Sequence, residues 1–208
     1  MTTGLMPSVR RFVRGLPLLV LAIAAPAQAA PPRFVFAQQP AILISIDGDP
    51  VYRAIEGSDY QRIVNTKAFI IRDAAGVHYL KLFDGWMEAY SLTGLWSEAG
   101  VPPLASEQTL LLAPRDAPRL DAGPLEVVVT TVPTELIVTD GPPRFVAVNG
   151  TSLQYVENTK AHVFKEPTDG ELYILTGDGW FRSWRTDGPW ELVPNRGLPA
   201  DIKAVAGS

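Results

Sequence analysis

Short apolar runs rich in β-branched residues, each bounded by turn residues, follow one another along most of the chain after residue 30. The run at 125–132 is typical, with four valines and two threonines. The dipeptides Asp84-Gly85 and Asp178-Gly179 lie between such runs, and we expect both to be two-residue hairpin turns with positive φ at both central positions. No segment has a helical period over twelve residues, although a short helical turn near 58–63 is consistent with the pattern. The sequence therefore predicts an all-β fold.

The same succession of runs and turns occurs twice in the chain. Residues of the first half match residues 93 positions later until Gly170, where one extra residue raises the offset to 94. The run Asn-Thr-Lys-Ala is identical at 65–68 and 158–161. The matched positions include the pairs Asp47/Asp140, Asp84/Asp178, Trp86/Trp180 and Trp96/Trp190. Agreement over this length predicts two copies of one structural unit.

We expect two tandem, homologous small β-domains, each ending in an antiparallel meander. The first repeat unit covers 34–101, the second covers 127–199, and a proline-rich linker at 102–126 joins them. A unit of roughly 70 residues buries only a modest core and is marginal alone. Contact between the two units, or with the linker, is therefore expected.

The first 29 residues have the composition of a secretory signal peptide. Three arginines, Arg10, Arg11 and Arg14, precede an apolar run at 16–25 that is too short to span a bilayer, and small residues around Ala29 suit signal peptidase. We expect cleavage near Ala29 and a periplasmic or secreted location. The adjacent pair of arginines leaves both the general and the twin-arginine export routes open.

Charge and composition exclude several classes of partner. The formal net charge is −4, and loss of the three arginines of the signal peptide leaves about −7. An acidic surface argues against nucleic acid and against anionic lipid, and no later stretch is apolar enough for a transmembrane helix. The chain has no cysteine, which excludes disulfides, thiolate metal sites and cysteine catalysis.

Candidate catalytic groups are few. The two histidines, His78 and His162, fall at different places in the repeat, so neither unit has the other's histidine. No nucleophile elbow, zinc-protease motif or phosphate-binding loop is present. The repeated aspartates precede turn glycines, where Asp bonds its own backbone, although paired carboxylates also serve glycosidases. We expect no enzyme activity, no metal and no cofactor, and an unrecognised hydrolase is the least favoured alternative.

The aromatic residues carry the remaining signal. We expect Trp96 and Trp190, which open new strands after turns, to be core residues, together with their repeated neighbours Trp86 and Trp180. Trp184 lies among polar residues and matches Tyr90 in the first unit, so an aromatic ring is kept there but not its identity. On one uninterrupted strand Trp184 would share a face with Trp180. Core and exposed positions are equally compatible with the sequence around Trp184 and Tyr90.

The string from 134 to 194, with its Gly-Trp-Phe, Gly-Pro-Trp and Val-Pro elements, resembles a recurrent unit of exported bacterial proteins labelled carbohydrate-binding family V/XII. Both repeat units carry it. Over about twenty residues, Gly179, Phe181, Trp184 and the run Trp-Glu-Leu-Val at 190–193 also follow the order seen in chitin- and cellulose-binding modules of families 5 and 12. Arg185 stands where those modules have a second tryptophan. The resemblance implies a carbohydrate-stacking site at Trp184 and, in the first unit, Tyr90.

Two functions follow from these observations. One is a non-catalytic exported module that binds a polysaccharide or envelope glycan through Trp184 and Tyr90. The alternative is a periplasmic structural or protein-interaction module with no carbohydrate ligand, in which the tryptophans close two small cores. Exposure of both rings is required by the first hypothesis, and burial of both would exclude it.

Overall fold

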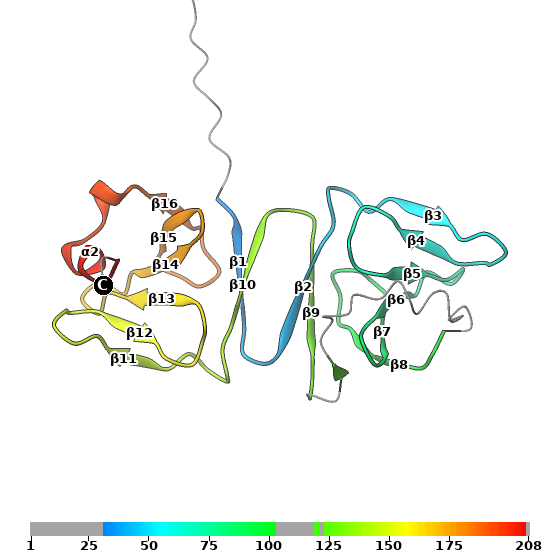
Figure 1. Cartoon of the computed structure of the whole chain (residues 1–208), viewed down its shortest axis with the longest axis horizontal. Coiled ribbons are helices and arrows are strands. Elements are labelled where there is room, and N and C mark those ends of the chain that lie inside the picture. The colour runs from blue at the N-terminus through cyan, green and yellow to red at the C-terminus, as the bar shows by residue number, and fades with distance from the viewer. Residues whose placement is uncertain (1–30, 103–118, 121–122, 207–208) are drawn as a thin grey trace, which may run out of the picture. The chain divides into compact units, whose positions relative to one another are not determined.

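The computed structural model describes residues 31–102, 119–120 and 123–206, and these residues form an all-β protein (Figure 1). The expected signal peptide and most of the linker lie outside the described residues. The strands are β1 (Arg33–Ala37), β2 (Ala41–Ser45), β3 (Tyr52–Ala54), β4 (Gln61–Ile63), β5 (Ile70–Arg72), β6 (His78–Lys81), β7 (Trp86–Ala89), β8 (Ser97–Ala99), β9 (Glu126–Thr130), β10 (Thr134–Val138), β11 (Phe145–Ala147), β12 (Gln154–Val156), β13 (His162–Lys165), β14 (Leu172–Thr176), β15 (Gly179–Ser183) and β16 (Glu191–Val193). The 3-10 helix η2 (Asn195–Gly197) and the α-helix α2 (Ala200–Ala206) follow β16.

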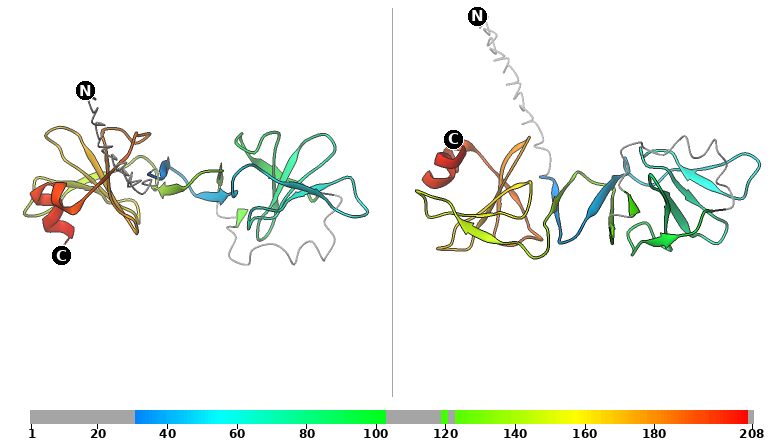
Figure 2. Two further views of the ribbon diagram at one scale, coloured as in Figure 1. Left: turned by 90° about the horizontal axis from the view of Figure 1, so that it is seen from above. Right: turned by 60° about the horizontal axis from the view of Figure 1, so that its bottom comes forward.

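Two six-stranded antiparallel meanders account for most of the strands. One meander runs from β3 to β8 and the other from β11 to β16, with each strand paired to its neighbours in the sequence. Each sheet is strongly curled (Figure 2). These two sheets confirm the predicted all-β fold of two tandem units that end in meanders. Each meander has six strands, because the segment before the Asn-Thr-Lys-Ala run also pairs into it.

The first two strands of each repeat pair with the other repeat. Strand β1 lies parallel to β10, and β2 lies parallel to β9 (Figure 1). The backbone N–H of Arg33 donates to the carbonyl of Pro133, and the N–H of Glu126 donates to the carbonyl of Pro40, both at 2.9 Å. These two bonds occupy matching positions of the repeat. The two units therefore exchange strands reciprocally.

The short connections between these strands fit the exchange. Only residues 38–40 separate β1 from β2, and only residues 131–133 separate β9 from β10. A parallel pair cannot be closed by so short a turn, so the parallel partner of each strand must come from elsewhere in the chain. Here the other repeat supplies it.

Strand exchange divides each hydrophobic core between the two repeats. We call β3–β8 with β2 and β9 lobe 1, and β11–β16 with β1 and β10 lobe 2. Phe34 of β1 packs in lobe 2 with Ile137, Phe181 and Trp190, whereas Val129 of β9 packs in the lobe 1 core. The repeat limits at 34–101 and 127–199 therefore do not separate the two cores.

Successive side chains of a strand point to opposite faces of the sheet. Each six-stranded sheet packs one face on the core just described and partly buries its other face in a second cluster. In lobe 2 this second cluster includes Tyr173, Trp180 and Ile202. Ile202 belongs to α2, which begins after the expected end of the second unit and was not predicted. In lobe 1 the second cluster is centred on Phe69 and Trp86.

The repeated Asn-Thr-Lys-Ala run forms the same clamp in both lobes. The amide of Asn158 donates to the carbonyls of Asp140 and Pro142 at 2.8 and 3.0 Å, and its Oδ1 accepts the Arg144 N–H at 2.9 Å. Asn65 makes the three matching bonds in lobe 1. Asparagine supplies both donors and an acceptor on one short side chain, which explains why this residue is repeated.

Replacing Asn158 with alanine should lower the free energy of unfolding by roughly 1–3 kcal/mol, since three backbone groups lose their partner at once. The neighbouring Lys160 is exposed, and Lys160→Ala serves as the matched control with little change expected. Urea unfolding followed by tryptophan fluorescence measures both. Equal stability of the two variants would show that the clamp contributes nothing.

The expected Asp-Gly hairpin turns were wrong in position and geometry. In lobe 2 the strand partners are Thr176 and Gly179, so the two turn residues are Gly177 and Asp178. Gly179 has a φ of 124°, and no described residue other than glycine has a positive φ. In lobe 1 the connection is a four-residue turn closed by a bond from the Leu82 N–H to the Gly85 carbonyl. The segment 58–63 likewise forms a loop and β4 in place of a helical turn.

Candidate functional site

The two candidate aromatic residues begin equivalent loops at the ends of equivalent strands. Loop 1, residues 90–96, connects β7 to β8 and starts at Tyr90; loop 2, residues 184–190, connects β15 to β16 and starts at Trp184. In loop 1 the Gly94 N–H donates to the Ser91 carbonyl at 3.0 Å, and in loop 2 the Gly188 N–H donates to the Arg185 carbonyl at 3.1 Å. The two loops therefore share this turn, although only loop 2 has a cis peptide bond, between Gly188 and Pro189.

A tryptophan at the end of each loop holds it against the core. The indole N–H of Trp96 donates to the Leu92 carbonyl at 3.1 Å, and that of Trp190 donates to the Thr186 carbonyl at 3.3 Å. Trp190 is only 6% exposed, and Trp96 is half-buried. Both residues therefore have the structural role that the repeat predicts. Each fixes its loop from the inside.

The rings at the start of the loops point to solvent. Tyr90 is 86% exposed and Trp184 is 62% exposed. Trp184 leaves the sheet because β15 ends at Ser183, so the strand that would have placed it beside Trp180 is interrupted. Trp180 is buried in the second cluster of lobe 2. The exposure required by the carbohydrate hypothesis is thus met at both positions.

A second apolar residue is exposed in each loop. Leu95 in loop 1 is 97% exposed, and its counterpart Pro189 in loop 2 is also exposed. Exposed apolar side chains are common when scattered singly, so the informative feature is their recurrence. Two exposed apolar residues stand at matching positions of both loops.

The polar surroundings of the two rings differ. In loop 2, Nε and Nη2 of Arg185 donate to the carboxylate of Asp187 at 2.7 and 2.5 Å. These hydrogen bonds hold the pKa of Asp187 below its usual value. Ser91 and Thr93 occupy the matching positions of loop 1. Loop 2 therefore presents an ion pair beside its ring, and loop 1 presents hydroxyl groups.

The other candidate residues of the sequence are distributed over the strands and turns. His78 lies in β6, where its Nε2 is 2.8 Å from the hydroxyl of Tyr52, and burial lowers its pKa. His162 begins β13 and is exposed. The turn residue Asp84 accepts a hydrogen bond from the Leu120 N–H. Within residues 31–102, 119–120 and 123–206, no three His, Asp or Glu residues are grouped to hold a metal ion.

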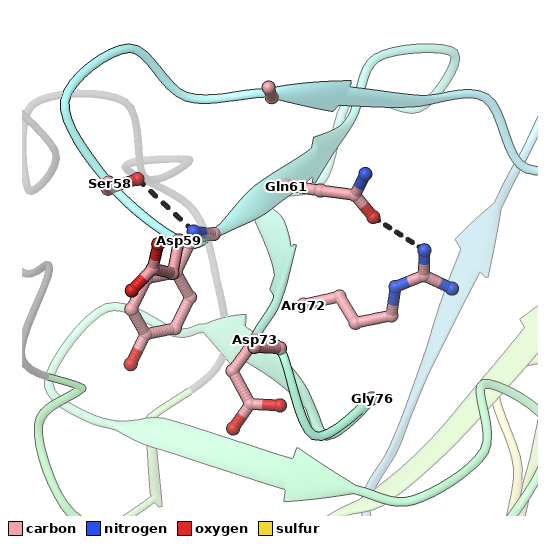
Figure 3. Close-up of a pocket in the computed structure, with 9 residues that line it drawn as sticks. Ser58, Asp59, Gln61, Arg72, Asp73 and Gly76 are labelled. Carbon is pink, nitrogen blue, oxygen red and sulfur yellow. Dashed lines mark hydrogen bonds between the residues drawn. The ribbon is translucent and has the colours of Figure 1, made fainter.

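A polar pocket of about 410 Å³ in lobe 1 was not foreseen (Figure 3). It lies between the turn before β4 and the turn after β5. Nη2 of Arg72 donates to Gln61 at 2.5 Å, and its guanidinium stacks on Tyr52 at 3.8 Å. Asp73 accepts the N–H of Val77. Arg72 and Asp73 therefore have partners within the protein, and the carboxylate of Asp59 also lines the pocket. No sequence motif marks it.

Comparisons with known proteins give no match: the chain has no significant similarity to a protein-family model, a curated protein or a solved structure. Among the described helices, none has the length and apolar character needed to cross a membrane. The fold and the loops thus define an all-β tandem-repeat protein with exchanged strands and two exposed aromatic loops.

Proposed function

We propose that the protein is a non-catalytic exported module that binds a polysaccharide or cell-envelope glycan through aromatic stacking on Trp184 and Tyr90. The observation that carries the proposal is their exposure, at 62% and 86%, at matching positions of the two lobes. The repeated tryptophans around them are buried or half-buried. An exposed ring at the same place in both units has no role in either core.

The chemistry of the loops suits a sugar ligand. Pyranose rings present C–H groups that pack on a flat aromatic face, and their hydroxyl groups need polar partners at the rim. Ser91 and Thr93 in loop 1, and the Arg185–Asp187 pair in loop 2, supply such partners. The indole anchors Trp96 and Trp190 fix the loops before binding, which reduces the entropy lost when a ligand binds.

The basic and apolar pattern of residues 1–29 supports export to the periplasm or beyond the cell. A glycan of the envelope or the surroundings is the kind of ligand available there. The acidic composition supports a partner other than nucleic acid or anionic lipid.

A periplasmic structural or protein-interaction module is the alternative function. The exposed pair Tyr90 and Leu95 favours it, because aromatic and aliphatic side chains together anchor protein interfaces. In that case the partner is a protein, and no polysaccharide is retained.

Trp184→Ala and Tyr90→Ala should each weaken retention of the mature protein on a binding polysaccharide by about tenfold, since one stacked aromatic contributes on the order of 1–1.5 kcal/mol. Depletion from solution by chitin, cellulose and peptidoglycan suspensions measures retention. Tyr155, which is 40% exposed and lies outside both loops, provides the control variant Tyr155→Ala. No retention of the wild-type protein on any glycan would refute the proposed function.

A further inference from the structure

A groove of about 690 Å³ opens beside loop 1. It is lined by loop 1 from Thr93 to Trp96 and by residues 125–129, which include most of β9. Residues of β1 and of the following turn close its end. The lining residues are Arg33, Val35, Gln39, Thr93, Gly94, Leu95, Trp96, Leu125, Glu126, Val127, Val128 and Val129. Strand exchange creates this groove, because β9 comes from the second repeat and loop 1 from the first.

The two lobes differ at this place through two residues. In lobe 2 the exchanged strand β1 carries Phe34 and Phe36, whose rings lie 4.8 and 6.3 Å from the ring of Trp190. These rings cover Trp190. The matching residues of β9 in lobe 1 are Val127 and Val129, which are smaller, and Trp96 stays half-buried. The groove is thus open in lobe 1, where valines replace the phenylalanines.

The lining of the groove has the chemistry of a saccharide site. Polar and apolar surface line the groove in nearly equal parts, and valines and Trp96 are among the apolar lining residues. The lining also includes one cation, Arg33, one anion, Glu126, and the uncharged polar residues Gln39 and Thr93. Opposite charges of equal number favour a ligand without net charge, and mixed donors and acceptors match hydroxyl groups. A pocket of this volume is in the usual range for small-molecule ligands.

Leu95, the second exposed apolar residue of loop 1, also lines the groove. Tyr90 begins the same loop, so loop 1 carries both the exposed ring and one wall of the groove. Loop 2 carries the exposed ring of Trp184 and an ion pair, and the ring of Trp190 at its end is covered by β1. Lobe 1 can therefore contact a longer stretch of a polysaccharide ligand than lobe 2.

We infer that this lobe 1 groove is a subsite for successive units of a neutral polysaccharide chain, so that lobe 1 binds several sugar units and lobe 2 binds a single stacked unit. The inference rests on the proposed function. On this account, the affinity of lobe 1 depends on the length of the polysaccharide, whereas lobe 2 stacks one sugar unit whatever the length.

The test measures affinity as a function of chain length in two variants of the mature protein. The Trp184→Ala variant retains Tyr90, the exposed ring of lobe 1. The Tyr90→Ala variant retains Trp184, the exposed ring of lobe 2. The probes are cello- and chito-oligosaccharides of two to six units, titrated by calorimetry. In Trp184→Ala the affinity should rise at least about tenfold from dimer to hexamer, and in Tyr90→Ala at most about threefold, the gain from having more binding registers.

Two groove variants locate the effect. Val127→Phe places in lobe 1 the side chain that lobe 2 holds at the matching position, and it should abolish the length dependence of Trp184→Ala. The substitution Gln39→Ala changes an exposed lining residue outside loop 1, so the protein should fold as the wild type does, and it should reduce the length dependence by about threefold. Val132→Ala, at the position that matches Gln39 in the other repeat, is the control.

The outcomes separate the two proposals. Absence of binding by the wild-type protein to every oligosaccharide and polysaccharide refutes the proposed function and the subsite together. Binding with the same length dependence in Trp184→Ala and Tyr90→Ala refutes the subsite alone, as does an unchanged length dependence in both groove variants.

Discussion

Replacing Phe34 with alanine should lower the free energy of unfolding by roughly 3–5 kcal/mol, and the loss should appear in the lobe built from the other repeat. Phe34 is 4% exposed and belongs to β1. Its ring contacts those of Phe181 and Trp190, with centroids 5.3 and 4.8 Å away. Truncation leaves a cavity between β1 and the lobe 2 sheet that the surrounding strands cannot fill.

Amide hydrogen exchange of the Phe34→Ala variant shows which lobe is destabilised. Amide protection should fall across β13 to β16, which belong to lobe 2, more than across β4 to β7. A pairing of β1 within its own repeat would produce the opposite result, with loss concentrated in the first six-stranded sheet. Tyr155→Ala, a partly exposed change in lobe 2, should stay within about 1 kcal/mol of the wild type.

Trp190→Ala should have a similarly large effect, about 3–5 kcal/mol, while Trp184→Ala should change stability by less than about 1 kcal/mol. The two tryptophans begin and end the same loop. Trp190 lies against Phe34 and Phe36 and donates its indole N–H to the Thr186 carbonyl, whereas Trp184 is 62% exposed. One ring stabilises lobe 2, and the other is free for a ligand.

Urea unfolding of the two variants, followed by far-ultraviolet circular dichroism, measures the difference directly. This probe avoids the fluorescence change caused by losing a tryptophan. A Trp184→Ala protein as unstable as Trp190→Ala would place Trp184 in the core and remove the basis for the stacking site. Wild-type stability in Trp190→Ala would contradict the account of the loop anchor.

The internal repeat and its residue types were sufficient to predict the all-β fold and the two meanders. The exchange of β1 and β9 was not predictable, since alternation along a strand shows which side chains are buried but not which strand lies beside them. The sequence around Phe34 predicts a buried side chain but does not say which repeat covers it. The three-residue connections 38–40 and 131–133 are also long enough for antiparallel hairpins of β1 with β2 and of β9 with β10, so their length does not reveal the exchange.

Local signals failed where tertiary contacts decided the outcome. Helix α2 has seven residues, which is too short for a helical period, and it forms because Ile202 is buried against the second face of the lobe 2 sheet. The turn predicted at Asp178-Gly179 lies one residue earlier in the structure, because Thr176 pairs with Gly179.

The candidate site followed from comparing the repeats more than from any motif. Tyr90 and Trp184 occupy matching positions of the two repeats, where both residues are aromatic but of different types. Both are exposed. The lobe 1 groove was invisible to the same comparison, because its walls come from both repeats. Phe34 and Val127 occupy matching positions of the repeats. Their difference in size indicates a groove only when β9 is known to lie beside loop 1.

The central claim is that the two exposed rings bind a glycan, and retention of the double variant Trp184→Ala/Tyr90→Ala on polysaccharide suspensions tests it most directly. Wild-type protein should be depleted by at least one of chitin, cellulose or peptidoglycan. The double variant should stay in solution while melting within a few degrees of the wild type, since neither ring belongs to a core. Equal depletion of the double variant and the wild type, or no depletion of the wild type, would contradict the claim.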